Sequence, residues 1–395
     1  MSAHLIPAIS DRDMLPADAA FMARTDLTQT RMLGYTPLNI DAVTTHLMGL
    51  LGERPSVRHV SGATDEILTI LEAAGLQVVE DIRRYESGAE AERQADALIA
   101  EGYRLFSPYP LPRGRYPENA QLVPPALWVH LNSKENLGDL VDPAHLPERK
   151  IMTFDEVRAR KINTPVWLKA AGDEATGWGY AVRHCTDATG FDIALSEMRK
   201  LDTSDRVIVE EHVPVTDSWC ASIIVHEDRT LYAGSAEQVF SCPGHQSGSL
   251  IDPANLLPDP NLAIAVGEAA RKRGFLGIAG MDIGQTVNGR TVVFDPNFRF
   301  NSSTSQALLH PAAAARARLP VSLSLNLMTT LSMAEIARRL REPIDDLWFV
   351  PTRLVDAARL SAANGRSIVT GFVLAENRDK AFATQAVIAA MLDTA

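Results

Sequence analysis

The sequence predicts an α/β protein made of more than one packed unit. A chain of 395 residues, 46% hydrophobic and 22% charged, is too long for one small core. Strand-like and helix-like segments alternate between residues 55 and 108, which is typical of a doubly wound unit. After residue 160 several strands follow, and two of them are joined by an Asn288-Gly289 hairpin turn. We therefore expect a doubly wound unit followed by a different α/β unit.

Charge and cysteine usage exclude several classes of protein. The net charge of -11 argues against sequence-independent nucleic-acid binding, although local cations could still hold one nucleotide. The three cysteines, Cys185, Cys220 and Cys242, have no metal-ligand spacing and suggest a reducing compartment. The N-terminus lacks a signal-peptide pattern, and no apolar stretch has membrane-spanning length. We expect a soluble, cytoplasmic protein without nucleic-acid or membrane partners.

The first unit has a regular order of elements. The strand "SVRHV" leads into a helix over residues 61–75 that ends at Gly75, and the strand "LQVVED" follows. A second helix over residues 89–102 ends at Gly102, before the strand-like "YRLFSP". The loops carry no G-x-G-x-x-G, so nothing indicates a dinucleotide site.

A proline-rich stretch over residues 109–125 reads as an extended linker and suggests a domain boundary. We divide the chain into four parts, namely residues 1–130, 131–206, 207–325 and 326–395. The further elements that the pattern predicts are a helix from 153, strands 164–170, 181–185, 206–213 and 218–228, a loop 241–260, a helix 261–274, strands 279–287 and 290–298, a helix 332–341, a strand 367–375 and a helix 378–392.

The stretch "FDPNFRFNSSTS" carries the first group of candidate site residues. The period of two in a strand places Asp295, Asn297 and Arg299 on one face, with Asp282 on the neighbouring strand. Two carboxylates and an amide oxygen suit Mg²⁺, which is usually held by one or two carboxylates and substrate phosphates. The alternative is a solvated polar strand end. Phe294, Phe298 and Phe300 alternate with the polar residues and argue against this alternative, because such a pattern buries one face of the strand and points the polar face at a ligand.

The second group is Lys169 and the glycine-rich loop "AGDEATGWGY" behind it. A mobile loop over phosphates needs backbone donors, a point charge and little bulk, and this segment supplies them. Gly172 and Gly177 have Walker A spacing, but Trp178 stands where lysine should be, so this is no P-loop. A surface lysine beside a turn remains the alternative.

The third group lies in "VIVEEHVPVTDSW", where an apolar strand runs into Glu210 and Glu211, with Asp217 beyond. A purine nucleotide needs a carboxylate for its exocyclic amine and another for ribose hydroxyls, which these residues could provide. A charged pair that ends a strand can also be simply solvated. The nearby "GHQSG" is not G-x-S-x-G, so a hydrolase that uses His245 and Ser247 is not favoured.

The order of these groups, from Lys134 to "DPNFR", resembles the ATP-grasp superfamily over about residues 130 to 310. The preceding unit is similar to a pre-ATP-grasp domain. The resemblance implies a two-lobed α+β ATP-grasp domain with a C-terminal α/β extension. It also implies that the cofactors are ATP and Mg²⁺, with Mn²⁺ as the alternative metal.

The resemblance assigns phosphate contacts to Lys134 and Lys169, with a catalytic role for Lys169 as well. Gly172, Thr176 and Gly177 belong to the loop that closes over the phosphates. In the part that resembles the adenosine site, Glu210 would accept a hydrogen bond from the adenine amine. The backbone of Glu211 and Val213 would contact the ring, and Asp217 would hold ribose.

The metal ligands implied by the resemblance are Asp282, Asp295 and Asn297, with Arg299 as the catalytic anion-stabilising residue. Two departures stand out. Family members usually carry glutamate where Asp295 stands. The D-alanine:D-alanine ligases carry a catalytic arginine where this chain has Gly280, which points away from that subgroup.

The implied reaction is attack of a carboxylate on the γ-phosphate of ATP, followed by opening of the acyl phosphate by an amine. The general likeness is to amino-acid or dipeptide ligases of specialised metabolism, and a homodimer is common among such enzymes. The loop 241–253 would face the acceptor, where His245, Ser247 or Arg299 would contact substrate. The alternatives are loading of a carrier protein, carboxylation of a metabolite, or nucleotide binding without turnover.

Overall fold

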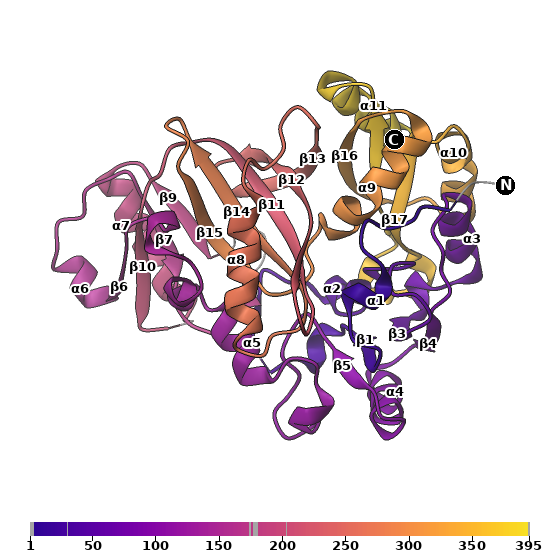
Figure 1. Ribbon diagram of the computed structural model, residues 1–395, viewed down its shortest axis with the longest axis horizontal. Helices are drawn as coiled ribbons and strands as arrows, with labels where there is room; N and C mark the ends of the chain where they lie inside the picture. The colour runs from indigo at the N-terminus through magenta and orange to yellow at the C-terminus, as the bar shows by residue number, and fades with distance from the viewer. Residues whose placement is uncertain (1–3, 30, 174, 177–180, 203, 394–395) are drawn as a thin grey trace.

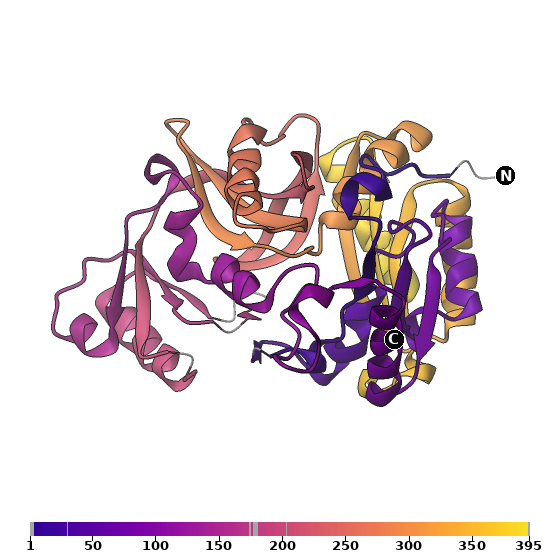
Figure 2. The ribbon, with the colours of Figure 1, turned by 60° about the horizontal axis from the view of Figure 1, so that its bottom comes forward.

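The computed structural model of the protein describes residues 4–29, 31–173, 175–176, 181–202 and 204–393 (Figure 1). A small four-stranded antiparallel sheet lies at one end of the molecule, and the C-terminal strands β16 to β18 lie at the other, as Figures 1 and 2 both show. No helix in the described residues combines the length and the apolar character needed to cross a membrane.

The N-terminal unit is a parallel sheet with the strand order β4-β3-β1-β5, as a doubly wound unit predicts. Thr64 and Ser87 cap its two longer helices through side-chain bonds to backbone N–H groups. Its elements are α1 (Asp11–Met14), β1 (Ala19–Met22), β2 (Met32–Leu33), α2 (Pro37–Ala42), η2 (Val43–Thr45), β3 (Pro55–His59), α3 (Asp65–Ala73), β4 (Asp81–Tyr85), α4 (Gly88–Ala100) and β5 (Arg104–Phe106).

Two expectations for this unit were wrong. The strand predicted over residues 76–81 begins only at Asp81, because its partner β3 begins at Pro55 and the register aligns these two residues. The proline-rich segment over residues 109–125 is not a loose linker. Tyr109, Leu111 and Tyr116 are 4%, 1% and 2% exposed, so the segment is packed into the protein.

The small antiparallel sheet has the order β6-β10-β7-β9 and is covered by α7. Val166 and Leu168 of β7 face a core with Phe191 of α7, so the alternation of the strand turns Trp167 and Lys169 to the opposite face. The elements here are β6 (Arg149–Thr153), α6 (Phe154–Arg158), β7 (Val166–Ala170), β9 (Val182–Cys185), α7 (Ala188–Lys200) and β10 (Arg206–Glu211).

Eight further strands form one sheet in the order β15-β14-β11-β12-β13-β16-β18-β17, and β2 pairs with a short strand of the glycine-rich loop in a separate two-stranded sheet. The strands of the large sheet are β11 (Val215–Val225), β12 (Thr230–Cys242), β13 (His245–Ile251), β14 (Gly277–Thr286), β15 (Thr291–Asn297), β16 (Val321–Thr329), β17 (Phe349–Val355) and β18 (Ser367–Ala375). The helices here are α5 (Pro125–Asn132), η5 (Lys134–Asp139), α8 (Pro260–Arg271), α9 (Thr304–Ala317), α10 (Met333–Asp345) and α11 (Arg378–Leu392).

The predicted loop 241–260 was wrong in its first half, because residues 245–251 form β13. This segment is rich in glycine and polar side chains, so it lacks the apolar alternation of a strand. Pairing with β12 on one side and β16 on the other holds it in the sheet. Through this strand the C-terminal region joins the same sheet as the Asp282–Asp295 hairpin.

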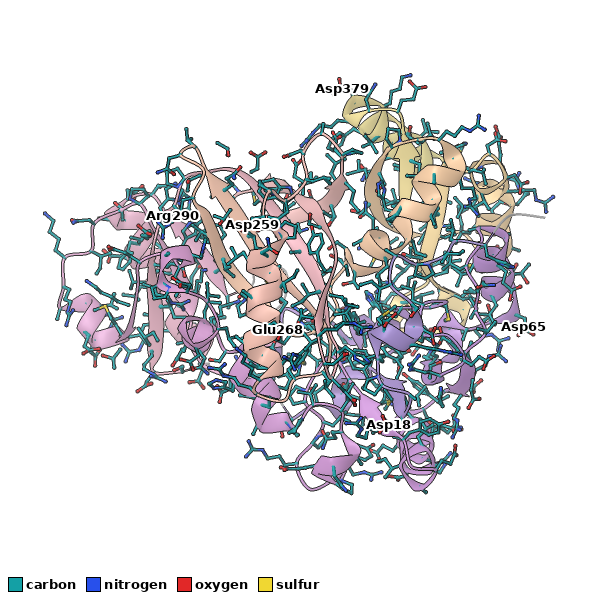
Figure 3. The ribbon with its side chains drawn as sticks, viewed as in Figure 1. Asp18, Asp65, Asp259, Glu268, Arg290 and Asp379 are labelled. Carbon is teal, nitrogen blue, oxygen red and sulfur yellow. The ribbon has the colours of Figure 1, made fainter. Side chains whose placement is uncertain are left out.

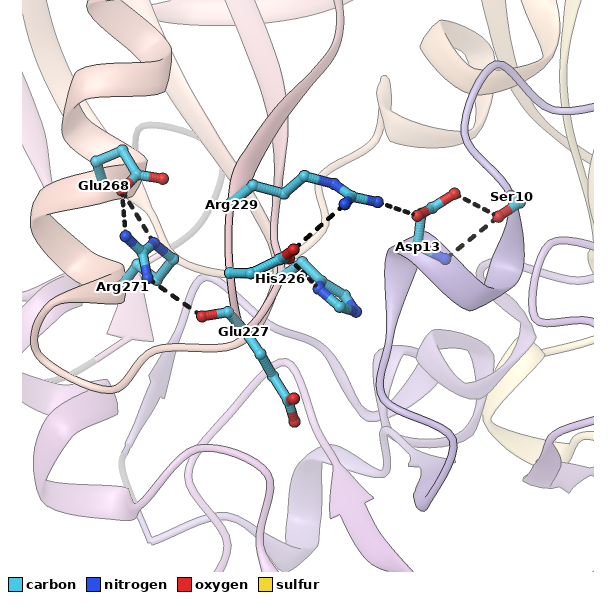
Figure 4. A network of polar contacts seen from close by, with 8 residues as sticks. Ser10, Asp13, His226, Glu227, Arg229, Glu268 and Arg271 are labelled. Atoms are coloured by element: carbon cyan, nitrogen blue, oxygen red, sulfur yellow. Dashed lines mark hydrogen bonds and ion pairs between the residues drawn. The ribbon is translucent and has the colours of Figure 1, made fainter.

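The ends of the chain meet in space. Helix α3 contacts β17 and α10, and the largest apolar core contains residues from both ends, such as Ile67 and Phe349. A polar contact also joins the middle of the chain to the N-terminal unit (Figure 4). Arg229, after the β11–β12 turn, donates to Asp13 of α1 at 2.6 Å, and Arg271 of α8 donates to the carbonyl of Glu227 at 3.1 Å.

Many charged side chains lie on the periphery, among them Asp65, Asp259 and Asp379 (Figure 3). Such exposed charges contribute little to stability and serve mainly solubility. The buried charges are therefore the informative ones, and several of them gather around β15.

Candidate active site

The β14–β15 hairpin brings the predicted metal ligands together. Asp282 lies directly opposite Asp295, and Asn297 lies opposite Gly280. Burial, followed by the nearby charge of Asp295, raises the pKa of Asp282 to about 6. Two neighbouring carboxylates beside an amide oxygen form a donor set that fits Mg²⁺. A side chain at position 280 would require the Asn301 amide, which lies 2.1 Å from the position a Cβ would take, to move.

Two lysines approach this hairpin from different parts of the chain. Lys134 of η5 forms an ion pair with Asp295. Lys169 of β7 donates to the carbonyl of Phe294 at 2.9 Å and pairs with Glu210 at 2.6 Å. Both lysines thus reach the strand that carries Asp295. Their positive charges lie where the phosphates of a nucleotide bound at this hairpin would need them.

Glu210 lies at the centre of a buried charge cluster. Its side chain is 1% exposed, and the closest cation after Lys169 is Arg149, at 3.9 Å. Sequence reasoning missed Arg149, which is the first residue of β6 and has no local motif around it. The carboxylate of Glu210 is therefore engaged by a lysine, and its contact with adenine stays a prediction.

The neighbouring candidate residues have partners of their own. Glu211 accepts from the backbone N–H of Glu148 at 2.8 Å, and Val213 is buried. Asp217 of β11 accepts from Asn255 at 3.1 Å. The same asparagine donates to Glu237 at 2.8 Å, so Asp217 belongs to a hydrogen-bonded group on the large sheet.

An aromatic stack lies on the face of the small antiparallel sheet that carries Lys169. The rings of Trp167 and His184 are stacked at 4.5 Å, and His212 lies 4.7 Å beyond His184. Gly244, at the tip of the β12–β13 hairpin, lies within 3.2 Å of Trp167, measured from the position a Cβ would take. Apolar rings beside Lys169 could accept the flat face of a purine, and sequence reasoning did not identify them.

Arg299 lies just beyond β15 and turns back toward it. Its guanidinium donates to the Asn297 side-chain oxygen at 2.9 Å and to the carbonyl of Phe300 at 3.3 Å. It also lies 5.9 Å from the ring of Tyr109, whose hydroxyl is bonded to Tyr35. Both tyrosines come from the N-terminal part of the chain, and no sequence pattern indicated their position.

Other candidates lie in the β12–β13 hairpin and in the glycine-rich loop, and their roles stay predictions. His245 and Ser247 are exposed, and their side chains bond within their own hairpin, to Ser241 at 3.0 Å and to the carbonyl of Val239 at 3.2 Å. In the glycine-rich loop, Gly172 adopts a φ of 117°, which favours glycine. The backbone of Thr176 lies in β8 (Ala175–Thr176), which pairs with β2. Gly177 lies outside the described residues.

Two family models match this chain. Residues 10–129 match the N-terminal domain of L-aspartate--L-methionine ligase, and residues 147–297 match the ATP-grasp domain of that ligase. Together the two matches take in well over half of the sequence.

Solved structures share the fold. An ADP complex of N5-carboxyaminoimidazole ribonucleotide synthetase has a TM-score of 0.56 and 13% identity, covering 95% of this chain and 97% of that one. The L-amino acid ligase from Bacillus licheniformis has a TM-score of 0.52 and 10% identity, covering 94% and 97%. Biotin carboxylase from Campylobacter jejuni has a TM-score of 0.56 and 13% identity, covering 97% and 92%.

The family matches, the shared fold and the convergence of Lys134, Lys169 and the paired aspartates agree with one another. The chain is an ATP-dependent enzyme that forms carbon–nitrogen bonds, and it belongs to the carboxylate–amine ligases of the ATP-grasp superfamily.

Proposed function

We propose that the protein joins two amino acids in an amide bond by way of an acyl phosphate. The observation that carries this proposal is the arrangement around β15, where Lys134, Lys169 and Arg299 surround Asp295 and Asn297. Attack of a carboxylate on ATP brings two anions together. A set of fixed cations is therefore the main requirement of such a site.

Asp282, Asp295 and Asn297 would hold Mg²⁺, which when bound offsets the charge of the ATP phosphates and orients them. Because Lys134 already pairs with Asp295, it is placed beside the same phosphates. Arg299 donates to Asn297 and to the carbonyl of Phe300, and its guanidinium has further N–H donors, so we assign to it the binding of the substrate carboxylate and the acyl phosphate.

The remaining candidates take nucleotide roles in this proposal. Glu210 is committed to Lys169, so we assign its carboxylate the positioning of that lysine. Backbone groups of Glu211 and Val213 would form hydrogen bonds with adenine, and the Asp217 carboxylate would bind the ribose hydroxyls. The loop with Gly172, Thr176 and Gly177 would exclude water, which otherwise hydrolyses an acyl phosphate.

The first substrate pair to test is L-aspartate and L-methionine, which the matching family description names. ADP release is measured with each amino acid alone and with both together, and mass spectrometry identifies the product. We expect ADP and a dipeptide in equal amounts with a suitable amino-acid pair and Mg²⁺. No ADP above background with any pair, or ADP released only with bicarbonate or a carrier protein, would contradict the proposal.

A matched pair of variants tests the site. Asn297→Ala removes a proposed metal ligand and the partner of Arg299, so we expect ADP release to fall by about 100-fold or more. Asn261→Ala makes the same chemical change at an exposed position of α8 and should leave the rate unchanged. Equal rates for the two variants would exclude Asn297 from the site.

A further inference from the structure

A second positively charged group lies beyond Arg299 and has no role in the assignments above. Arg353 of β17 donates to Nε2 of His46 at 2.9 Å, and His46 follows η2 in the N-terminal unit. The Nε and a terminal nitrogen of the same guanidinium donate to the Thr370 hydroxyl at 3.3 and 3.1 Å. Three elements far apart in the sequence thus meet at one guanidinium.

The hydrogen bond fixes the state of His46. A guanidinium can only donate, so Nε2 must accept, and the imidazole is neutral with its proton on Nδ1. Burial, and then the charges of Arg353, Arg58 and Arg299, hold the pKa of His46 well below its ordinary value. His46 therefore presents an N–H donor and does not supply a negative charge.

The charge of Arg353 is not balanced by the described part of the protein. None of the described carboxylates lies within ion-pair distance of Arg353 or of Arg299, whereas Arg58, beside them, pairs with Glu80 at 2.6 Å. Burial lowers the pKa of Arg353 to about 10, and no nearby anion in the described residues counteracts this effect. A desolvated cation without a counter-charge is unfavourable unless a ligand supplies the anion.

The surroundings hold this group in place. Arg58 donates to the carbonyls of Thr44 and His46 at 2.6 and 2.9 Å, which fixes the segment that carries the imidazole. The Thr370 hydroxyl donates to Asn326 at 3.0 Å, so a polar row crosses β16, β18 and β17 up to Arg353. Preorganised donors of this kind are typical of binding sites and not of chance contacts.

The group adjoins the proposed reaction centre. The ring of His46 lies 5.1 Å from that of Phe300, the residue directly after Arg299, and the charge of Arg299 acts on His46. Two guanidiniums without carboxylate partners among the described residues therefore lie near one imidazole. A guanidinium has five N–H donors, and the known contacts of Arg353 leave donors on both terminal nitrogens for a ligand.

We propose that Arg353 and His46 bind a carboxylate of an amino-acid substrate that stays ionised through the reaction, next to the carboxylate activated at Arg299. One guanidinium with a neutral imidazole matches the single charge and the two oxygens of a carboxylate. This inference rests on the proposed function. The bound group is either the second carboxylate of the activated amino acid or the α-carboxylate of the acceptor, and the test separates these sources.

The test compares acids with their amides as ligands. Calorimetry with Mg²⁺ and a non-hydrolysable ATP analogue measures binding of L-aspartate, L-asparagine, L-aspartic acid α-amide, L-methionine and L-methioninamide. We expect the wild type to bind one acid at least about 10-fold more tightly than its amide. Arg353→Gln should bind that acid and its amide about equally. Loss of preference at aspartate identifies the activated substrate as the source, and loss at methionine identifies the acceptor.

Two controls exclude a merely structural role. Arg366→Gln makes the same change at an exposed arginine nearby and should keep the wild-type preference. Without ligand, Arg353→Gln should melt no lower than the wild type, because it removes a partly buried charge that has no carboxylate partner among the described residues. Arg353→Lys keeps the charge and should retain part of the preference for the acid.

Several outcomes would overturn the inference. They are an unchanged acid preference in Arg353→Gln, a wild type that binds acids and amides alike, and a wild type that binds none of the probes. ADP release that persists in any of these cases leaves the ligase reaction intact and rejects only the carboxylate site. Conversely, loss of preference in Arg353→Gln without ADP release in the wild type supports the carboxylate site and rejects the amino-acid ligase.

Discussion

At the scale of single residues, the pair of Lys169 and Glu210 shows how a proposed catalytic lysine is held in a buried place. The side chains of Glu210 and Lys169 are 1% and 7% exposed, and the lysine also donates to the carbonyl of Phe294 on β15. A buried ion pair contributes little net stability, but the loss of one partner is costly. The pair therefore serves positioning more than stability.

We predict that Lys169→Met lowers the free energy of unfolding by about 3–5 kcal/mol, because Glu210 is left buried without its closest cation. The double variant Lys169→Met with Glu210→Leu should regain most of that stability and still release no ADP. Calorimetric melting and the ADP assay check the two effects. Lys161→Met, at an exposed lysine, is the matched control. A stable Lys169→Met protein, or an active double variant, would contradict the assigned role.

Some of these residues could be predicted from local patterns and others could not. Asp282, Asp295 and Asn297 lie in a hairpin that consecutive residues predict, through the turn and the alternation of apolar and polar side chains. The structure places the two aspartates opposite one another. Arg353 and His46 meet only because β17 packs beside the N-terminal unit. Neither has a motif around it, so only the folded structure shows their contact.

At the scale of elements, the glycine-rich loop is tied to the N-terminal unit by backbone pairing. The two residues of β2 pair in parallel with the two residues of β8, in register from Met32 to Ala175. Because β8 belongs to the segment after Lys169, this pairing links the loop to a different part of the molecule. A short ladder of this kind can hold a loop closed without deep burial.

We predict that Met32→Pro uncouples ATP use from product formation. Proline removes a backbone N–H and disturbs the β2–β8 ladder, so water should reach the acyl phosphate more often. The ratio of ADP to dipeptide should rise several-fold over the wild type. Met32→Ala keeps the N–H group and should remain coupled. A one-to-one ratio in the proline variant would show that the ladder does not protect the intermediate.

The elements that the sequence predicts well are those with strong local signals. The last strand and helix, Ser367–Ala375 and Arg378–Leu392, have the bounds we expected from apolar alternation and helical spacing. In contrast, β13 was missed because its glycine and polar residues carry no strand pattern. Its neighbours in the sheet, β12 and β16, decide its conformation.

At the scale of the whole molecule, the candidate site lies where several parts of the chain meet. The proposed metal ligands come from the large sheet, Lys169 from the small sheet, and Tyr109 and His46 from the N-terminal unit. The order of motifs predicted the ATP-grasp fold. It did not predict that β16, β18 and β17 continue the large sheet, because pairing between strands far apart in the sequence produces no local sequence pattern. The division at residues 130, 206 and 325 stays a prediction.

The central claim is that the enzyme transfers the γ-phosphoryl group of ATP to a carboxylate oxygen. Substrates with ¹⁸O in their carboxylates, supplied one at a time with an unlabelled partner, test it most directly. We predict that one labelled substrate passes a single ¹⁸O atom to the inorganic phosphate, together with ADP and dipeptide. Unlabelled phosphate from both substrates, or AMP and pyrophosphate as products, would contradict the mechanism.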